Sequence, residues 1–277
     1  KLVVMWDDND ICIDGPTSMT VSDDQIARFK ASGWNTMACD GHDPAAVEKC
    51  LAAAQGSDKP TFIACKTTIA FGSPNKGGTS AAHGAALGAD EIAATRKQLG
   101  WEHGPFEIPQ DIMAAWRLAG TRAAKAAADW QIRLDASAKK AEFGRRIAGI
   151  LPENWLDAVN ALKIRLADEA PAMATRNASQ EALEVINPAV PETVGGSADL
   201  TGSVNTLTKD LGALSSDNYG GRYVHYGVRE HAMGAAMNGM ALHGGMIPYA
   251  GTFFVFTDYL RPAMRLIVRS PADRPAR

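Results

Sequence analysis

The sequence of 277 residues lacks several features that would place it in a particular class of protein. No stretch reaches the ~20 consecutive apolar residues of a membrane-spanning helix, and no signal-like apolar region follows the first residue. The 28 basic and 31 acidic side chains give a net charge of −3, without a block of like charge that could bind a nucleic acid or a membrane surface. These absences predict a soluble protein with no nucleic-acid partner and no membrane partner.

Cysteine is scarce, and its spacing argues against a disulfide framework or a zinc cluster. Cys12, Cys39, Cys50 and Cys65 form no CxxC pair and have no neighbouring histidines at zinc-ligand spacing. Isolated cysteines of this kind are typical of free thiols in a reducing compartment. We therefore expect a cytoplasmic protein.

Apolar residues, in contrast, are abundant. They make up 46% of the chain, enough for a core of ordinary size, and the length fits about two domains at ~150 residues each. Strand-like runs at residues 2–6 and 61–69 alternate with amphipathic segments. One of these segments follows Ser22, which has capping-box spacing to Gln25, and another opens at Asp43. The order β, α, β, α, β predicts a parallel sheet.

The middle of the chain has a different composition. From residue 110 to 168 it is rich in alanine and charge at helical spacing, whereas alternating strand and helix patterns return from about residue 179. We predict an α/β fold with two parallel-sheet domains, both incomplete, joined by a helical connector. The expected boundaries are 1–109, 110–170 and 171–277. The tail 270–277 should be disordered or a broken end.

A polar run follows the first predicted strand. Asn9 offers a side-chain oxygen and Ile11 a backbone carbonyl on one turn, a pair of hard oxygen donors suited to Mg²⁺ or Ca²⁺. The same residue types also form simple solvated turns, here closed by Asp14-Gly15. Residues alone leave both interpretations open.

A glycine-rich loop follows the strand at 61–69. It contains FGSPNK at residues 71–76 and leads to His83 in the sequence AHG. A histidine in such a loop is a candidate for proton transfer, although a solvent-exposed or capping role is the commoner one.

The second half carries three motifs in order: RNASQ at 176–180, GGSADL at 195–200 and YGVRE at 226–230. Glu230 could serve as a buried acid at a strand-to-helix junction, or as a first-turn glutamate that favours the helix dipole. Phe253, Phe256 and Tyr259 follow at helical spacing, where aromatic residues either stack on a ligand or pack in a core.

Together these motifs resemble those of transketolases, thiamine-diphosphate-dependent enzymes, over nearly the whole chain. The resemblance implies two thiamine-diphosphate-binding-type domains, the rear of the diphosphate domain and the front of the pyrimidine domain. It implies that Glu230 activates the aminopyrimidine and that His83 acts near the diphosphate and substrate. The resemblance further implies that Asn9 and Ile11 bind the metal (Mg²⁺, Ca²⁺ or Mn²⁺). It implies cofactor contacts by Asp199, Phe253, Phe256 and Tyr259. The substrate phosphate would be bound by Arg176 and Ser203.

The implied reaction is two-carbon ketol transfer between sugar phosphates by a homodimer. The sequence departs from the family where Ser80 replaces a second histidine and where Val204 separates Ser203 from Asn205. An upstream Gly-Asp-Gly metal motif and the terminal domain are missing, so we expect an internal segment without turnover of its own. Dihydroxyacetone synthase, deoxyxylulose-phosphate synthase and a non-catalytic product are the alternatives.

Overall fold

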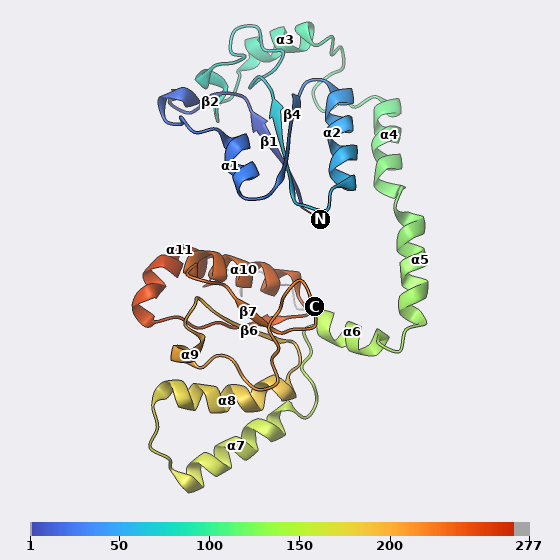
Figure 1. The fold of residues 1–277 in the computed structure, drawn as a ribbon. Coiled ribbons are helices and arrows are strands. Elements are labelled where there is room, and N and C mark those ends of the chain that lie inside the picture. The colour runs from blue at the N-terminus through green and yellow to red at the C-terminus, as the bar shows by residue number, and fades with distance from the viewer. Residues whose placement is uncertain (1, 269–277) are drawn as a thin grey trace. The chain divides into compact units, whose positions relative to one another are not determined.

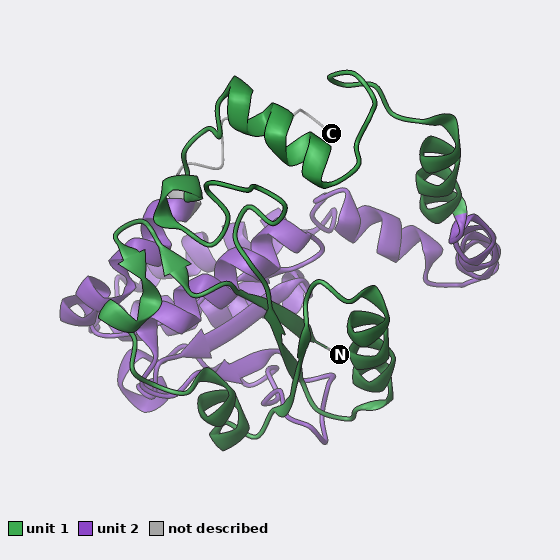
Figure 2. Ribbon diagram, turned by 90° about the horizontal axis from the view of Figure 1, so that it is seen from above, with its two compact units in different colours: residues 1–121 green, residues 122–277 purple. Residues whose placement is uncertain are grey.

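The computed structural model of the chain describes residues 2–268, which fall into two compact units (Figures 1 and 2). Unit 1 is Lys1–Thr121 and unit 2 is Arg122–Arg277, drawn in green and purple in Figure 2. The tail at 270–277, for which disorder was predicted, lies outside the described residues. Within the described range, no helix is both long and apolar enough to cross a membrane.

Unit 1 contains a parallel sheet of three strands in the order β1-β5-β4. The strands are β1 (Val3–Asp8), β4 (Asn35–Asp40) and β5 (Thr61–Lys66), joined through α1 (Gln25–Ala31) and α2 (Pro44–Gly56). The register pairs the last residues of β1 and β4 with Lys66, so the carboxyl ends share one edge. The α/β prediction is confirmed for this unit.

The central strand explains why this sheet forms. Residues 61–65 of β5 are all buried, as expected for a strand with neighbours on both sides and a helix above. Ile63 and Cys65 pack with Ala54 of α2 in the core. The predicted capping box at Ser22 is wrong: Asp24 caps α1 by accepting the N–H of Ala27, because it directly precedes the first helical residue.

The rest of unit 1 consists of short elements and helices around this sheet. They are the strands β2 (Ile11–Cys12) and β3 (Gly15–Pro16), the 3-10 turns η1 (Thr17–Met19) and η2 (Ser80–Ala82), and the helices α3 (Ala89–Gln98) and α4 (Gln110–Thr121). β2 and β3 pair antiparallel directly after β1.

Unit 2 begins with helices and continues with a second parallel sheet. The first helices are α5 (Ala124–Asp135), α6 (Lys140–Ile147), α7 (Trp155–Glu169) and α8 (Thr175–Ala189). The sheet has the order β7-β6-β8 and consists of β6 (Thr193–Ser197), β7 (Tyr223–His225) and β8 (Ile247–Pro248). The other elements are α9 (Thr201–Val204), α10 (Glu230–His243), η3 (Phe254–Phe256) and α11 (Thr257–Val268).

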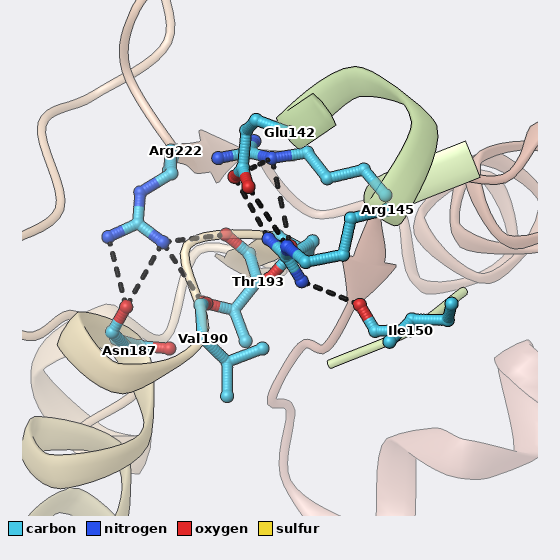
Figure 3. Close-up of polar contacts among 9 residues, drawn as sticks. Glu142, Arg145, Ile150, Asn187, Val190, Thr193 and Arg222 are labelled. Atoms are coloured by element: carbon cyan, nitrogen blue, oxygen red, sulfur yellow. Dashed lines mark hydrogen bonds and ion pairs between the residues drawn. The ribbon is translucent and has the colours of Figure 1, made fainter. Parts of the chain in front are cut away.

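A polar cluster attaches α6 to the start of β6 (Figure 3). Arg145 bridges Glu142 on its own helix and the buried Glu192, and it also donates to the carbonyl of Ile150 at 2.6 Å. Nearby, Arg222 donates to the carbonyl of Asn187 at the end of α8. These contacts fix the helical segment against the sheet of unit 2.

Helices α10 and α11 pack closely at Gly234. A Cβ at this position would stand 2.1 Å from Leu260 Cδ1 and 3.0 Å from Ala263 Cβ. Only glycine permits this approach, since both neighbours are buried side chains of α11. The contact fixes the first turns of α10 relative to α11.

Candidate functional site

The predicted metal residues lie just past the end of β1. Asn9 Oδ1 accepts the N–H of Ile11 at 3.0 Å, which closes a tight side-chain turn. The hairpin partner of Ile11 is Pro16, which has no N–H to donate to the Ile11 carbonyl. No group of three His, Cys, Asp or Glu side chains within residues 2–268 is arranged to hold a metal ion. A cation here would therefore depend on amide and carbonyl oxygens.

The acidic side chains around Asn9 are already engaged by β5. Lys66 Nζ lies 2.5 Å from Asp10 Oδ2 and 3.4 Å from Asp8 Oδ2, and its hydrogen bond to Asp10 is the main cause of its raised pKa. The hydroxyl of Thr67 donates to Asp7. These contacts hold the polar turn to the edge of the sheet.

The loop after β5 is attached to unit 1 at its start. The N–H of Thr68 donates to His42 Nε2 at 2.8 Å, and the His42 ring stacks on Phe71 with a centroid distance of 4.0 Å. His42 follows β4, so the carboxyl edge of the sheet positions the loop. An open pocket at this edge is lined by β4, β5 and the residues that follow each strand.

A buried carboxylate on α3 holds the middle of the same loop. Glu91 is only 8% exposed and accepts hydrogen bonds from the Ser73 hydroxyl, from Asn75 N–H and Nδ2, and from Lys76 N–H. These donors, first of all the Ser73 hydroxyl, lower the pKa of Glu91 to about 2. Residues 73–76 (SPNK) are thus folded around the carboxylate of Glu91.

His83 lies at the end of η2, where its N–H bonds the carbonyl of Ser80 at 3.0 Å. Its Nδ1 is buried and has no hydrogen-bond partner among the described residues. Buried ring nitrogens are normally paired, so this atom is open to a ligand. No hydrogen bond or ion pair within residues 2–268 connects His83 with Asn9 or Ile11.

In unit 2, Glu230 is the first residue of α10 and is 6% exposed. Its Oε1 accepts a hydrogen bond from the Thr252 hydroxyl at 3.0 Å. Phe253 follows Thr252 directly, and its ring lies 5.8 Å from that of Phe256, which in turn lies 6.1 Å from Tyr259. The structure therefore brings the predicted acid next to the start of the predicted aromatic row.

The aromatic row is only partly buried, with Phe256 half-buried in its middle. Phe253 is 44% exposed and Tyr259 is exposed as well. Within unit 2 the two end rings are therefore accessible, and stacking on a planar ligand stays a prediction.

The GGSADL motif forms the end of β6 and the turn beyond it. The Ser197 hydroxyl accepts the N–H of Leu200 at 3.0 Å, and Asp199 has the left-handed backbone conformation (φ 63°) that Asp tolerates. Gly196 leaves room for an aromatic ring, because a Cβ there would stand 2.4 Å from Tyr226 Cε2. Asp199 is exposed at the carboxyl end of the strand.

The predicted phosphate contacts lie on neighbouring helix ends. Arg176 is exposed in the first turn of α8, and Ser203 is half-buried in α9. Asn205 Nδ2, just past α9, donates to Asn177 Oδ1 at 3.0 Å. This contact brings the two helix ends together without joining Arg176 to Ser203.

Sequence reasoning missed Glu91 and His42 as members of these arrangements, and it missed the contact of Thr252 with Glu230. Glu91 had one visible signal, its place in the first turn of a helix that follows the loop. The partners of His42 and Thr252 are 26 and 22 residues away in sequence, so no local pattern pointed to them.

Comparisons with known proteins identify the family of this chain. Residues 1–152 match the family model "Transketolase, thiamine diphosphate binding domain", and residues 171–272 match "Transketolase, pyrimidine binding domain". The chain belongs to the transketolase family. It is 51% identical over 268 residues to the transketolase of Rhodobacter capsulatus and 52% identical over 266 residues to that of Sinorhizobium medicae.

Each of these alignments covers 96% of this chain but only 40% and 38% of the two transketolases. The chain thus spans about 40% of the length of these relatives. The solved transketolase of Leishmania mexicana superposes with a TM-score of 0.85 at 35% identity, over 96% of this chain and 40% of that one. The predicted family and the fold of two transketolase α/β domains are confirmed.

Proposed function

We propose that this chain supplies part of the active site of a transketolase, which transfers a two-carbon ketol unit from a ketose phosphate to an aldose phosphate. The observation that carries the proposal is Glu230, a buried carboxyl group with one oxygen held by Thr252, next to a partly exposed aromatic row. The family match supports the same reaction class. A transketolase of Pichia stipitis, 38% identical to this chain, was solved in complex with sedoheptulose 7-phosphate.

The residues present fit thiamine diphosphate. When bound, this cofactor supplies a nucleophilic ring carbon and an electron sink for carbon–carbon bond cleavage. Glu230 would share a proton with the ring nitrogen of the aminopyrimidine, which a buried carboxyl group can do. Phe253, Phe256 and Tyr259 would stack on that ring, and the unpaired Nδ1 of His83 would take a diphosphate or substrate oxygen.

The metal part of the proposal depends on Asn9 and Ile11. Their amide and carbonyl oxygens suit Mg²⁺, which takes hard oxygen ligands together with phosphate oxygens and water. Ca²⁺ and Mn²⁺ accept similar ligands. The two residues would hold a cation, which would supply positive charge to offset the negative charge of the diphosphate.

We further propose that the substrates are sugar phosphates and that the working enzyme is a homodimer. Arg176 offers a guanidinium fork and Ser203 a hydroxyl for the phosphate, and Asp199 would lie near the cofactor. These assignments come from the family resemblance, and the closeness of α8 to α9 supports them.

A chimera tests the proposal. Residues 2–268 replace the aligned segment of the Rhodobacter capsulatus transketolase, and the product is given thiamine diphosphate, Mg²⁺, xylulose 5-phosphate and ribose 5-phosphate. We expect sedoheptulose 7-phosphate from the chimera and none from this chain alone. Glu230→Gln in the chimera should lower turnover by at least about 100-fold.

Other outcomes separate the alternatives. A chimera that binds thiamine diphosphate but makes a different product would favour another enzyme of the same cofactor class. A folded chimera that neither binds the cofactor nor turns over would show that the segment is non-catalytic, and equal turnover of Glu230→Gln would refute the role of Glu230.

A further inference from the structure

A single side-chain hydrogen bond fixes the buried carboxyl group of Glu230. The Thr252 hydroxyl donates to Oε1 at 3.0 Å, and no other side-chain hydrogen bond of Glu230 is present in the described part of the chain. We infer that Thr252 is a positioning residue that holds Glu230 by Oε1 and so leaves Oε2 to face the ring nitrogen of the cofactor. This inference rests on the proposed function.

The backbone of Thr252 has a fixed place because Gly251 before it is paired with β6. Gly251 N–H donates to Gly196 O at 3.1 Å, and Ala198 N–H donates to Gly251 O at 3.3 Å. A Cβ at Gly251 would stand 2.7 Å from Thr206 Cγ2, so the backbone at Gly251 lies close against the side chain of Thr206. Thr252 therefore leaves the sheet at a defined point.

The backbone of Glu230 is fixed from the other side. It opens a 14-residue helix whose first intrahelical bond runs from Met233 N–H to Arg229 O at 2.8 Å. One turn later, Gly234 packs against Leu260 of α11. Because α11 follows the segment that carries Thr252, the same packing limits movement of both partners.

The chemistry of the hydroxyl suits this role. A carboxylate has several acceptor positions, and a threonine hydroxyl donates only one proton, so it satisfies one oxygen and leaves the other. A glutamate side chain without such a contact samples several rotamers. A residue that restricts them prepares the productive geometry before the cofactor arrives.

The test uses this chain with ¹³C-labelled glutamate, with and without thiamine diphosphate and Mg²⁺. The Glu230 Cδ signal is identified by its loss in Glu230→Gln. In Thr252→Val, which keeps the shape but removes the donor, this signal should shift, whereas Thr252→Ser should leave it in place. The affinity for thiamine diphosphate, from calorimetry, should fall about tenfold in Thr252→Val and recover in Thr252→Ser.

Thr257→Val is the matched control, because the Thr257 hydroxyl donates to the Phe254 carbonyl at 2.6 Å on the same segment and has no side-chain hydrogen bond to Glu230 within residues 2–268. It should change neither the signal nor the affinity. Circular dichroism checks that all variants fold. If Thr252→Val leaves the Glu230 signal unmoved, or weakens binding no more than Thr257→Val, the inference is wrong. If the wild-type chain binds no cofactor while the signals behave as expected, the affinities are compared in the chimera, and a wild-type chimera that binds no thiamine diphosphate would refute the proposed function and leave the contact standing.

Discussion

Two of the buried glutamates among residues 2–268, Glu91 and Glu230, have opposite surroundings. Glu91 accepts four hydrogen bonds from three residues of one loop, which leaves little capacity for a ligand. Among the described residues, Glu230 accepts one side-chain hydrogen bond, from Thr252. Both oxygens of Glu91 are engaged, Oε1 by three donors and Oε2 by one, whereas Oε2 of Glu230 accepts no side-chain hydrogen bond from the described residues. The hydrogen-bond partners, not burial, distinguish the two glutamates.

The first prediction concerns Glu91→Gln. The amide would place an NH₂ group against donors of Ser73, Asn75 and Lys76, so we expect the unfolding temperature at neutral pH to fall by several degrees. Its neighbour Asp90 lies exposed in the same helical turn, and Asp90→Asn should change the temperature little. Thermal unfolding followed by circular dichroism measures both.

The pH dependence of this effect has a definite sign. The pKa of Glu91 falls from 4.5 to about 2 on folding, so its contribution to stability is complete above 4.5 and is lost as pH falls from there toward 2. The wild type and Glu91→Gln should therefore differ most at about pH 7 and converge at about pH 2 to 3. A difference that grows on acidification would contradict this assignment.

Sequence reasoning named candidate ligand residues but not the side-chain contacts that organise the loops around them. Asn9, His83 and Glu230 stand in motifs that can be read locally. The donors to Glu91 come 15 to 18 residues earlier, and their convergence depends on the path of the loop. Such contacts are set by tertiary structure, so no spacing rule predicts them.

At the scale of elements, strands and helices followed the apolar pattern closely. The predicted strand at 61–69 is β5, which ends earlier at Lys66, because the backbone of Thr68 turns to bond His42. Helix α10 begins at Glu230, at the predicted strand-to-helix junction, and Gly227 before it takes a left-handed conformation (φ 66°). The types of element were predictable, whereas their ends depended on contacts with other parts of the chain.

The second prediction concerns two glycines on α10. Gly234→Ala would drive a methyl group into Leu260 and Ala263, so we expect it to destabilise the chain by about 1–3 kcal/mol. Gly239→Ala is the matched change on the same helix, with nothing within 4 Å of its Cβ, and should stabilise by about 0.5–1 kcal/mol. Urea unfolding gives both values. Equal effects of the two substitutions would show that α10 and α11 do not pack as described.

At the scale of the whole molecule, the sequence predicted two α/β parts and a helical stretch between them. The structure has helices α4 to α7 over this stretch and divides into units after Thr121. The predicted boundaries at 109/110 and 170/171 stay predictions. Where one compact unit ends depends on which helices pack on which sheet, and composition does not record that.

The third prediction concerns the junction of the units. Arg122 lies exposed in the turn between α4 and α5, where trypsin can reach an unpacked backbone. We expect the earliest pair of fragments to be 1–122 and 123–277, identified by mass spectrometry. Arg122→Gln should slow their appearance. Earlier cleavage after Lys66, at the end of the central strand, would contradict the division into units.

The close approach of Tyr226 to Gly196 limits how this sequence can evolve. A side chain at position 196 would occupy the space of the Tyr226 ring, so the two positions cannot vary independently. A lineage that exchanges Gly196 must first shrink residue 226, and that step alone opens a cavity beside β6. The order of mutations is thereby constrained, and each change becomes acceptable only on the background of the other.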